Sequence, residues 1–183
     1  MRKVIVSSYA TLDGKVDDLQ EWVSPWNGDT VAAYHEALLA DSDGLLLGRT
    51  TYQVFAMIWP PRSGQLAYAD KINSMAKHVA STTLTDADLA WENSHLIEGG
   101  VADGVAKLKE QPGGDLVVYG GPGLVSTLQE HDLVDEYRVM VHPVLLGKGR
   151  GLVKDGGPRV NLDLVDTTVI RPGVAILTYR PVR

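Results

Sequence analysis

Two glycine-bearing segments have residue types suited to binding phosphate groups. Gly48-Arg49-Thr50-Thr51-Tyr52 follows the apolar run Leu45–Leu47, and Tyr119-Gly120-Gly121-Pro122-Gly123-Leu124 ends another such run. In both, the residues after the glycine are predicted to begin a helix, whose first N–H groups lack partners within the helix and attract an anion. Glycine lets a phosphate approach the backbone closely, and the Arg49 guanidinium can pair with it.

Each segment alone also has an ordinary structural explanation. A glycine cluster often serves only a tight turn, and an isolated arginine is commonly solvated or salt-bridged. The second segment lacks the G-x-G-x-x-G spacing of a Rossmann fingerprint, and no acidic residue follows at the ribose-binding distance. Two such junctions on neighbouring parallel strands would, however, open at the same edge of the sheet, where α/β proteins bind ligands. Together they predict a dinucleotide site that is not of the Rossmann type.

The elements that position these segments alternate between strand and helix, a pattern typical of a mainly parallel sheet. After His131 the pattern changes to long strands, which predicts an antiparallel C-terminal hairpin. The predicted strands are Val4–Ser8, Leu45–Leu47, His78–Ser81, His95–Ile97, Leu116–Tyr119, Glu136–His142, Leu162–Val169 and Val174–Tyr179, the last two joined at Arg171-Pro172-Gly173. The predicted helices are Val31–Ala40, a segment from about Gly48 to Ile58, Tyr68–Met75, Val101–Glu110 and Leu124–Glu130.

Composition narrows the function classes. The 183 residues predict one domain over 1–183, and a formal charge of −6 with no basic run argues against a nucleic-acid partner. Zero cysteines exclude disulfides, thiolate nucleophiles and cysteine-ligated metals. No apolar stretch approaches the length that spans a bilayer, so we expect a soluble, cytoplasmic protein without a membrane partner. The histidines lack metal-ligand spacing, and we expect no metal and a surface or helix-end position for each: His35, His78, His95, His131 and His142.

Several segments together resemble a known superfamily. Gly48–Tyr52, Ser81-Thr82-Thr83 and Gly120-Gly121-Pro122-Gly123 fall in the order and approximate spacing of the NADPH-binding segments of dihydrofolate reductases. The sequence is more similar still to the C-terminal reductase domain of the riboflavin-biosynthesis deaminase-reductase and its stand-alone relatives. That likeness is carried by Ser8–Gly14, Asp135–Val139 and Pro143–Gly149. It implies a three-layer α/β/α dihydrofolate-reductase-like fold with a mainly parallel central sheet and a C-terminal antiparallel hairpin.

The resemblance also implies which residues would bind NADPH. Arg49 and Thr50 would contact cofactor phosphates, Ser81 and Thr82 would lie near the 2′-phosphate, and the segment from Gly120 to Leu124 would line the pyrophosphate and nicotinamide. The full expected set is Ala10, Gly48, Arg49, Thr50, Ser81, Thr82, Tyr119, Gly120, Gly121, Pro122, Gly123 and Leu124.

Two carboxylates are candidates for delivering the proton that accompanies hydride transfer. Asp13 lies in a Leu-Asp-Gly turn that borders the substrate in the riboflavin branch. Asp29 follows Pro25-Trp26-Asn27, which is similar to the segment before the acidic residue of dihydrofolate reductases, but it follows the tryptophan sooner. Each has a structural alternative, a turn aspartate for Asp13 and a helix N-cap for Asp29.

The substrate side is expected to be aromatic. Residues 17–29 are predicted to form an active-site loop, and tryptophans there could stack on a heterocycle or pack as a lid. The expected substrate-binding residues are Trp22, Trp26, Tyr52 and Pro143.

The activity implied is that of 5-amino-6-(5-phosphoribosylamino)uracil reductase or a reductase of a similar pyrimidine or pterin. Dihydrofolate reduction and non-catalytic nucleotide binding are the alternatives. The long late strand and Pro143–Gly149 resemble the dimer-forming region of the riboflavin-type reductases, so a homodimer is expected.

Overall fold

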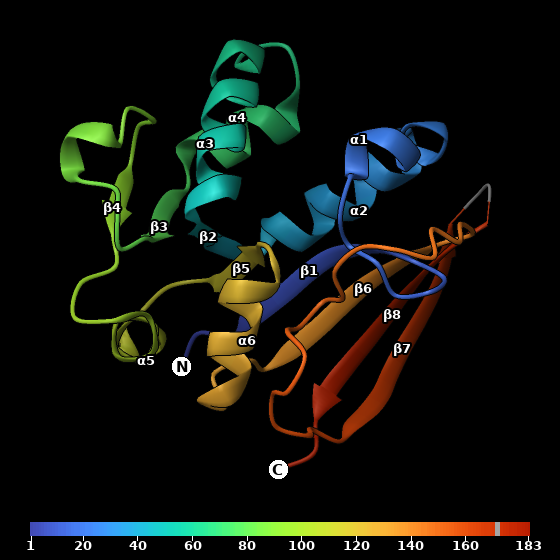
Figure 1. The fold of residues 1–183 in the computed structure, drawn as a ribbon. Coiled ribbons are helices and arrows are strands. Elements are labelled where there is room, and N and C mark those ends of the chain that lie inside the picture. Colours follow the sequence, from blue (N-terminus) through green and yellow to red (C-terminus); the bar gives the residue numbers. More distant parts are fainter. Residues whose placement is uncertain (171–172) are drawn as a thin grey trace.

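An eight-stranded mixed sheet organises the chain, and the computed structural model describes residues 1–170 and 173–183 of it (Figure 1). The strand order is β4-β3-β2-β5-β1-β6-β8-β7, with parallel pairing from β4 to β6 and antiparallel pairing of β8 with both β6 and β7. The strands are β1 (Val4–Thr11), β2 (Ser42–Gly48), β3 (Ala76–Ala80), β4 (Ser94–Leu96), β5 (Asp115–Tyr119), β6 (Glu136–His142), β7 (Leu162–Ile170) and β8 (Val174–Pro181).

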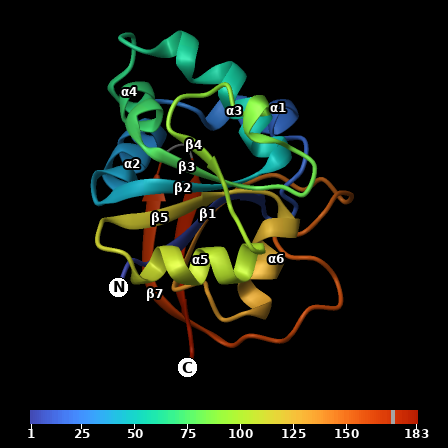
Figure 2. The same ribbon diagram turned by 90° about the vertical axis from the view of Figure 1, so that its left-hand side faces the viewer.

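Helices cover both faces of the parallel part of the sheet (Figure 2). They are α1 (Leu19–Trp22), α2 (Asp29–Ala40), α3 (Arg49–Ile58), α4 (Ala67–Ser74), α5 (Val101–Glu110) and α6 (Pro122–Glu130), with 3₁₀ turns η1 (Ser24–Trp26), η2 (Pro60–Arg62) and η3 (Asp86–Asp88). The first four α-helices lie on one side of the sheet, and α5 and α6 lie on the other. The fold is therefore the α/β/α sandwich that the sequence predicted.

Of the three hydrophobic clusters, the two that pack on either face of β1, β2 and β5 follow from the alternation of side chains along each strand. Ile5 and Leu47 point toward α2, α3 and α4, whereas Val4, Val6 and Leu46 point toward α5 and α6. The strands β1, β2 and β5 are buried on both faces, which explains why each appears in the sequence as a continuous apolar run. These strands form the rigid frame behind the candidate site.

Most predicted elements occur where the sequence placed them. The strand Glu136–His142 and the helix Val101–Glu110 have the predicted bounds, and β7 and β8 form the expected antiparallel pair. Of the turn predicted to join that pair, Arg171 and Pro172 lie outside the described residues. The segment 17–29 is more ordered than a loop, because α1 and η1 occupy part of it.

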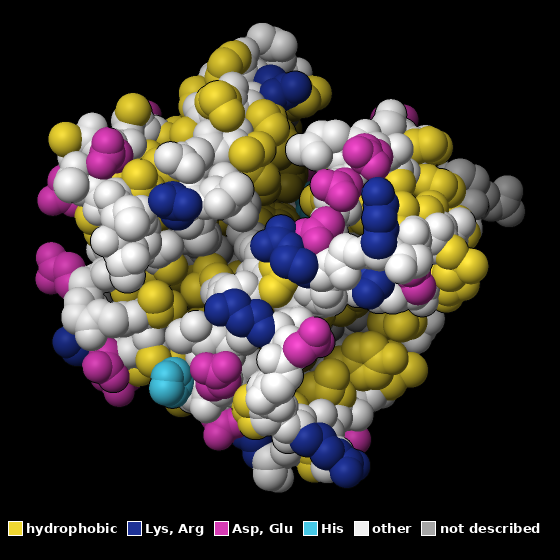
Figure 3. All heavy atoms as spheres, viewed as in Figure 1, with side chains coloured by type: hydrophobic (Ala, Val, Ile, Leu, Met, Phe, Trp, Pro, Cys, Tyr) yellow, Lys and Arg dark blue, Asp and Glu magenta, His cyan; other side chains and the backbone are white. Residues whose placement is uncertain are grey.

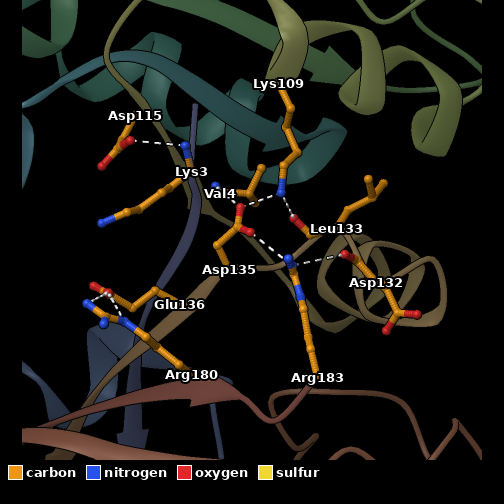
Figure 4. Close-up of polar contacts among 10 residues, drawn as sticks. All are labelled: Lys3, Val4, Lys109, Asp115, Asp132, Leu133, Asp135, Glu136, Arg180 and Arg183. Atoms are coloured by element: carbon orange, nitrogen blue, oxygen red, sulfur yellow. Dashed lines mark hydrogen bonds and ion pairs between the residues drawn. The ribbon is translucent and has the colours of Figure 1, made fainter. Parts of the chain in front are cut away.

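The amino-terminal ends of β1, β5 and β6 carry a cluster of paired charges, which we call the amino edge (Figure 4). Asp135 accepts hydrogen bonds from the Val4 N–H, 2.9 Å, and from the Lys109 ammonium and the Arg183 guanidinium. Lys109 is buried and also donates to the Leu133 carbonyl. Ion pairs thus tie helix α5 and the C-terminus to the start of the sheet.

Glu136, at the start of β6, forms the second part of this amino edge. Its side chain is 2% exposed and bonds both Arg138, at 2.7 Å, and Arg180, at 3.1 Å. A buried carboxylate requires such partners, since an unpaired charge there would be costly.

The lateral border of the sheet that β7 forms is exposed. Every residue of β7 from Leu162 to Val169 is exposed, including Leu164, Val165 and Val169. Within the described residues, no helix has both the length and the apolar character needed to cross a membrane.

Candidate functional site

The candidate site lies at the carboxyl-terminal ends of the parallel strands, which we call the carboxyl edge. Strands β2 and β5 are parallel neighbours, with Leu47 beside Tyr119 in the register. Helix α3 leaves β2 toward one face of the sheet, and α6 leaves β5 toward the other. Adjacent strands whose helices diverge in this way create a crevice, the usual ligand position in open α/β sheets. The expected adjacency of the two glycine junctions is therefore present.

Both helix N-termini at this crevice are open. Gly48 is the N-cap of α3 and Gly121 the N-cap of α6, and neither helix has a side-chain cap. A Cβ atom added at either glycine would meet no atom within 4 Å. No side chain at these glycines therefore covers the first-turn N–H groups, which lack partners within the helix and can donate to a phosphate oxygen.

Pro122 is the first residue of α6, a position that has no N–H to satisfy. It is buried, as is Leu124, and both help to anchor the helix against the sheet. The Val125 N–H donates to the Gly121 carbonyl, so the first-turn donors of α6 are the N–H groups of Gly123 and Leu124.

Arg49 links the first junction to the strand β3 segment. Its guanidinium donates to the Thr83 hydroxyl at 3.0 Å, and its side chain is exposed. The Ser81 hydroxyl accepts from the N–H groups of Thr83 and Leu84 at 3.1 and 3.0 Å, which fixes this turn, and Thr82 is exposed beside it. A cation and the hydroxyl residues of the Ser81-Thr82-Thr83 segment thus adjoin the Gly48 junction, and the binding roles expected for Arg49, Ser81 and Thr82 stay predictions.

Lys154 is a second cation that sequence reasoning missed. A Cβ atom added at Gly123 would lie 3.9 Å from the Lys154 ammonium nitrogen. The backbone N–H of Lys154 donates to Ser126 on α6 at 2.8 Å, which holds the segment against the helix. A cation beside a helix N-terminus is repelled by the positive end of the helix dipole. The cation and the helix N-terminus nevertheless both attract the same anion. Lys154 is 30 residues or more from Gly121 in the chain, so no local pattern could have found it.

The two predicted acids do not have the geometry of proton donors. The Asp13 carboxylate accepts from the Thr11 hydroxyl at 2.6 Å and from the N–H groups of Gly147 and Leu146 at 2.7 and 3.2 Å. These hydrogen bonds, that from Thr11 first, lower the pKa of Asp13 to about 2, so it stays ionised. Asp13 fastens the end of β1 to Leu146 and Gly147, an arrangement that suits a structural role rather than the expected catalytic one.

Asp29 is the first residue of α2 and is exposed, and Gly28 rather than Asp29 is the N-cap. The side of α2 that faces the sheet carries Val31, His35 and Leu38 instead. Gly28 is therefore the N-cap, which corrects the expected cap role of Asp29, and the exposed first-turn position does not support its expected role as an acid.

Two expected substrate residues are core residues. Tyr52 is fully buried, packs against Trp91 and accepts the Trp91 backbone N–H at 3.1 Å. Trp22 is also buried, donates its indole N–H to the Asp17 carbonyl at 2.8 Å and packs edge-on against His142. Neither ring has a free face for a heterocycle.

Trp26 and Pro143 remain accessible. Trp26 is half-buried, with its ring edge-on to that of His142, and Pro143 is exposed directly after β6. Ala10 is buried on β1, the neighbour of both β5 and β6. The predicted site residues thus divide into an exposed group at the crevice and a buried group that supports it.

Two histidines correct the expectation of surface positions. His35 is 7% exposed and His142 is 1% exposed. His35 bonds the hydroxyls of Tyr9 and Tyr119 through its two ring nitrogens. Burial without charged neighbours lowers the pKa of His35 to about 4.

The surface is hollowed between the α3–α4 region and the α1 region, and hydrophobic side chains line the recess (Figure 3).

Comparison with known proteins identifies the family. The RibD C-terminal domain family matches residues 2–176, and the chain belongs to this family of reductase-like domains. The protein YyaP of Bacillus subtilis (strain 168) is 30% identical over 97% of this chain and 94% of its own.

Solved structures agree with this membership. A candidate riboflavin biosynthesis protein from Shewanella sp. PV-4 is 25% identical, with a TM-score of 0.77 and 99% of both chains covered. Dihydrofolate reductase from Enterococcus faecalis, solved with NADP(H), is 12% identical, with a TM-score of 0.64 over 98% of this chain and 96% of its own. The fold is that of the dihydrofolate-reductase-like class.

Proposed function

We propose that the protein is an NADPH-dependent reductase that transfers a hydride to a small pyrimidine- or pterin-like substrate. The observation that carries this proposal is the pair of uncapped helix N-termini, α3 and α6, opening on opposite sides of adjacent parallel strands. Membership of the RibD C-terminal domain family agrees with it.

The residues present fit a dinucleotide phosphate. Gly48 and Gly121 leave the approach to the helix N-termini open, and the cations Arg49 and Lys154 stand beside them. In this proposal α6 and Lys154 bind the pyrophosphate, while Arg49, Ser81 and Thr82 bind the adenosine 2′-phosphate. NADPH would supply the hydride, and the chain would orient the two reactants and exclude water at the hollow between the α3–α4 region and the α1 region (Figure 3).

The substrate proposed by the family relationship is 5-amino-6-(5-phosphoribosylamino)uracil or a compound of similar chemistry. Dihydrofolate is the less suitable acceptor, because Asp29 is exposed on the first turn of α2 and the inward position there is Val31. A buried carboxylate that could protonate a pterin is therefore lacking at that turn.

We also propose that the molecule pairs with a second copy of itself, through β7 rather than through the expected late strand β6, because β6 is already paired with β1 and β8. This strand presents an unpaired edge and exposed apolar side chains, the features that favour strand or face pairing. A groove of about 460 Å³ runs beside it, with Glu136, Arg138 and Arg180 among its lining residues. Light scattering should give the mass of a dimer, and Leu164→Lys should give that of a monomer.

Cofactor titration tests the main proposal. Tryptophan fluorescence or calorimetry should show micromolar binding of NADPH, weaker binding of NADH, and none of FMN or an F420-type deazaflavin. Oxidation of NADPH is then followed with amino-pyrimidine and pterin acceptors. Tight binding of NADPH without oxidation by any acceptor would favour a non-catalytic nucleotide-binding protein, and lack of nicotinamide binding would refute the proposal.

A further inference from the structure

Four side chains from four different elements form a hydrogen-bonded chain beside the carboxyl edge. The Tyr9 hydroxyl on β1 lies 2.7 Å from Nε2 of His35 on α2. The Nδ1 atom of His35 lies 3.0 Å from the Tyr119 hydroxyl on β5, which in turn accepts the Tyr68 hydroxyl of α4 at 3.4 Å. We call this set the Tyr9–Tyr68 chain. The cofactor proposal does not use it.

The surroundings of His35 keep the ring uncharged. Its titratable neighbours are the phenols of Tyr9, Tyr34, Tyr68 and Tyr119, whose rings pack around it from every adjoining element, and no carboxylate or cation contacts it among the described residues. Burial lowers the pKa of His35 to about 4 and raises that of Tyr68 to about 12. At neutral pH the Tyr9–Tyr68 chain therefore holds protons without carrying charge.

The Tyr68 hydroxyl, as the donor to Tyr119, sets the direction of the Tyr9–Tyr68 chain. Tyr68 donates to Tyr119, so the hydrogen of the Tyr119 hydroxyl is satisfied if it is donated to Nδ1 of His35. Nε2 then carries the ring hydrogen and donates it to the Tyr9 oxygen. If Nδ1 carried the ring hydrogen while Tyr68 still donated to Tyr119, the buried Tyr119 hydroxyl, 8% exposed, would keep a hydrogen without an acceptor.

The favoured direction leaves the hydrogen of Tyr9 free at the end of the chain. Tyr9 is half-buried, immediately before Ala10 on β1, and Tyr119 immediately precedes Gly120 of the second glycine junction. The Tyr9 end of the Tyr9–Tyr68 chain therefore lies close to the place where the nicotinamide and the acceptor are proposed to meet.

We infer that Tyr9 donates the proton that completes hydride transfer, and that His35 resupplies it from Tyr119 and Tyr68. This inference rests on the proposed function and fills the role for which Asp13 and Asp29 lack the geometry. As the acceptor carbon gains the hydride, the adjacent nitrogen or oxygen takes the Tyr9 proton and the Tyr9 oxygen takes the proton of Nε2. Nδ1 takes the proton of Tyr119, Tyr119 takes that of Tyr68, and water replaces the proton lost by Tyr68. The net transfer is one hydride and one proton.

A nitrogen NMR spectrum of the histidine side chains tests the direction without any substrate. The expected spectrum at pH 7 shows a neutral His35 ring with its hydrogen on Nε2, assigned by the loss of its signals in His35→Gln. A hydrogen on Nδ1, or a charged ring, would overturn the inference. This test is independent of NADPH, so it separates failure of the relay from failure of the proposed function.

Turnover supplies the second test, on whichever acceptor the wild type reduces. Tyr9→Phe should lower kcat about 100-fold or more and leave the Kd for NADPH within about twofold. Tyr137→Phe removes the hydroxyl of another buried tyrosine, on β6 and outside the chain, and should retain both values. Wild-type kcat in Tyr9→Phe would refute the role of Tyr9.

Discussion

The two ends of the parallel strands satisfy their polar groups in opposite ways. At the amino edge Asp135 and Glu136 each bind two cationic side chains, and the charges are held by partners within the chain (Figure 4). At the carboxyl edge the N-termini of α3 and α6 have no side-chain caps. The difference indicates that the amino edge stabilises the fold, whereas the carboxyl edge keeps its donors for a ligand.

The largest expected effect is on the amino edge. Asp135→Ala removes the anion that the buried Lys109 ammonium contacts, and an uncompensated buried charge should lower the free energy of unfolding by about 3 kcal/mol. Urea unfolding measures this change. Asp115→Ala, which removes one acceptor from the exposed Lys3 N–H, should cost about 1 kcal/mol or less. NADPH affinity should not change in either variant, and a large change would break the division between the two edges.

Acid should lower the free energy of unfolding through His35, which lies beside the carboxyl edge. Its pKa is about 4 in the folded protein against an ordinary 6.5, so the unfolded chain binds a proton at higher pH than the folded one. The stability present above pH 6.5 is therefore lost as the pH falls toward 4, by about 3 kcal/mol. His78, whose pKa burial also lowers to about 4, acts in the same direction.

Urea unfolding of the wild type and of His35→Gln between pH 7 and pH 4.5 measures that contribution. His35→Gln should flatten the pH dependence, and His131→Gln, at an exposed position away from both His35 and His78, should leave it as in the wild type. Equal slopes for His35→Gln and the wild type would contradict the assignment.

Filling the open N-cap of α6 should affect binding alone. Gly121 has φ −75° and free space at its Cβ, so Gly121→Val folds normally but occupies the position proposed for a phosphate. We expect NADPH binding to weaken about 100-fold, or about 2.7 kcal/mol, with little change in unfolding. Calorimetry measures both, and Gly28→Val at the N-cap of α2 provides the matched substitution. Unchanged affinity in Gly121→Val would remove α6 from the proposed site.

Arg49 should contribute less to NADPH affinity than the N-terminus of α6, because its side chain is exposed and hydrated. Arg49→Ala should weaken NADPH binding about 10-fold and NADH binding less, since the guanidinium is proposed to pair with the 2′-phosphate. Arg62→Ala, an exposed arginine that bonds the Ile58 carbonyl, is the control. An equal loss for the two cofactors would place Arg49 at the pyrophosphate instead.

The smallest effect is expected at Lys154. An exposed ammonium near α6 should add about threefold to NADPH affinity at low salt and nothing measurable at roughly 0.5 M salt, where screening is nearly complete. A Lys154→Ala titration at two salt concentrations measures this, and a loss that persists in high salt would show a buried contact instead.

The sequence predicted the parallel strands and the helices between them because the patterns that indicate these elements lie within short segments. Leu45–Leu47 and Leu116–Tyr119 are apolar runs of strand length, each followed by a glycine, and together they predict parallel strands with a common ligand edge. The structure adds one or a few residues at the ends of most elements. The adjacency of β2 and β5 also agreed with the prediction, since both junctions were expected to act together.

What the sequence could not predict depends on contacts between distant residues. His35 is polar and lies on a helix with exposed neighbours, so nothing nearby indicates that Tyr9 and Tyr119 enclose it. Asp13 has the pattern of a turn aspartate near a substrate, but its partners at 146–147 are more than 130 residues away. Tyr52 occupies the first turn of α3, where helix geometry turns its ring inward to Trp91. In each case tertiary packing decided the role.

The glycines at Gly48 and Gly121 have a consequence for mutagenesis. Donors that belong to the main chain survive the truncation of neighbouring side chains, so an alanine scan of the crevice would report mild defects and understate its importance. Substitutions that add bulk, rather than those that remove it, are the ones that would expose the binding surface.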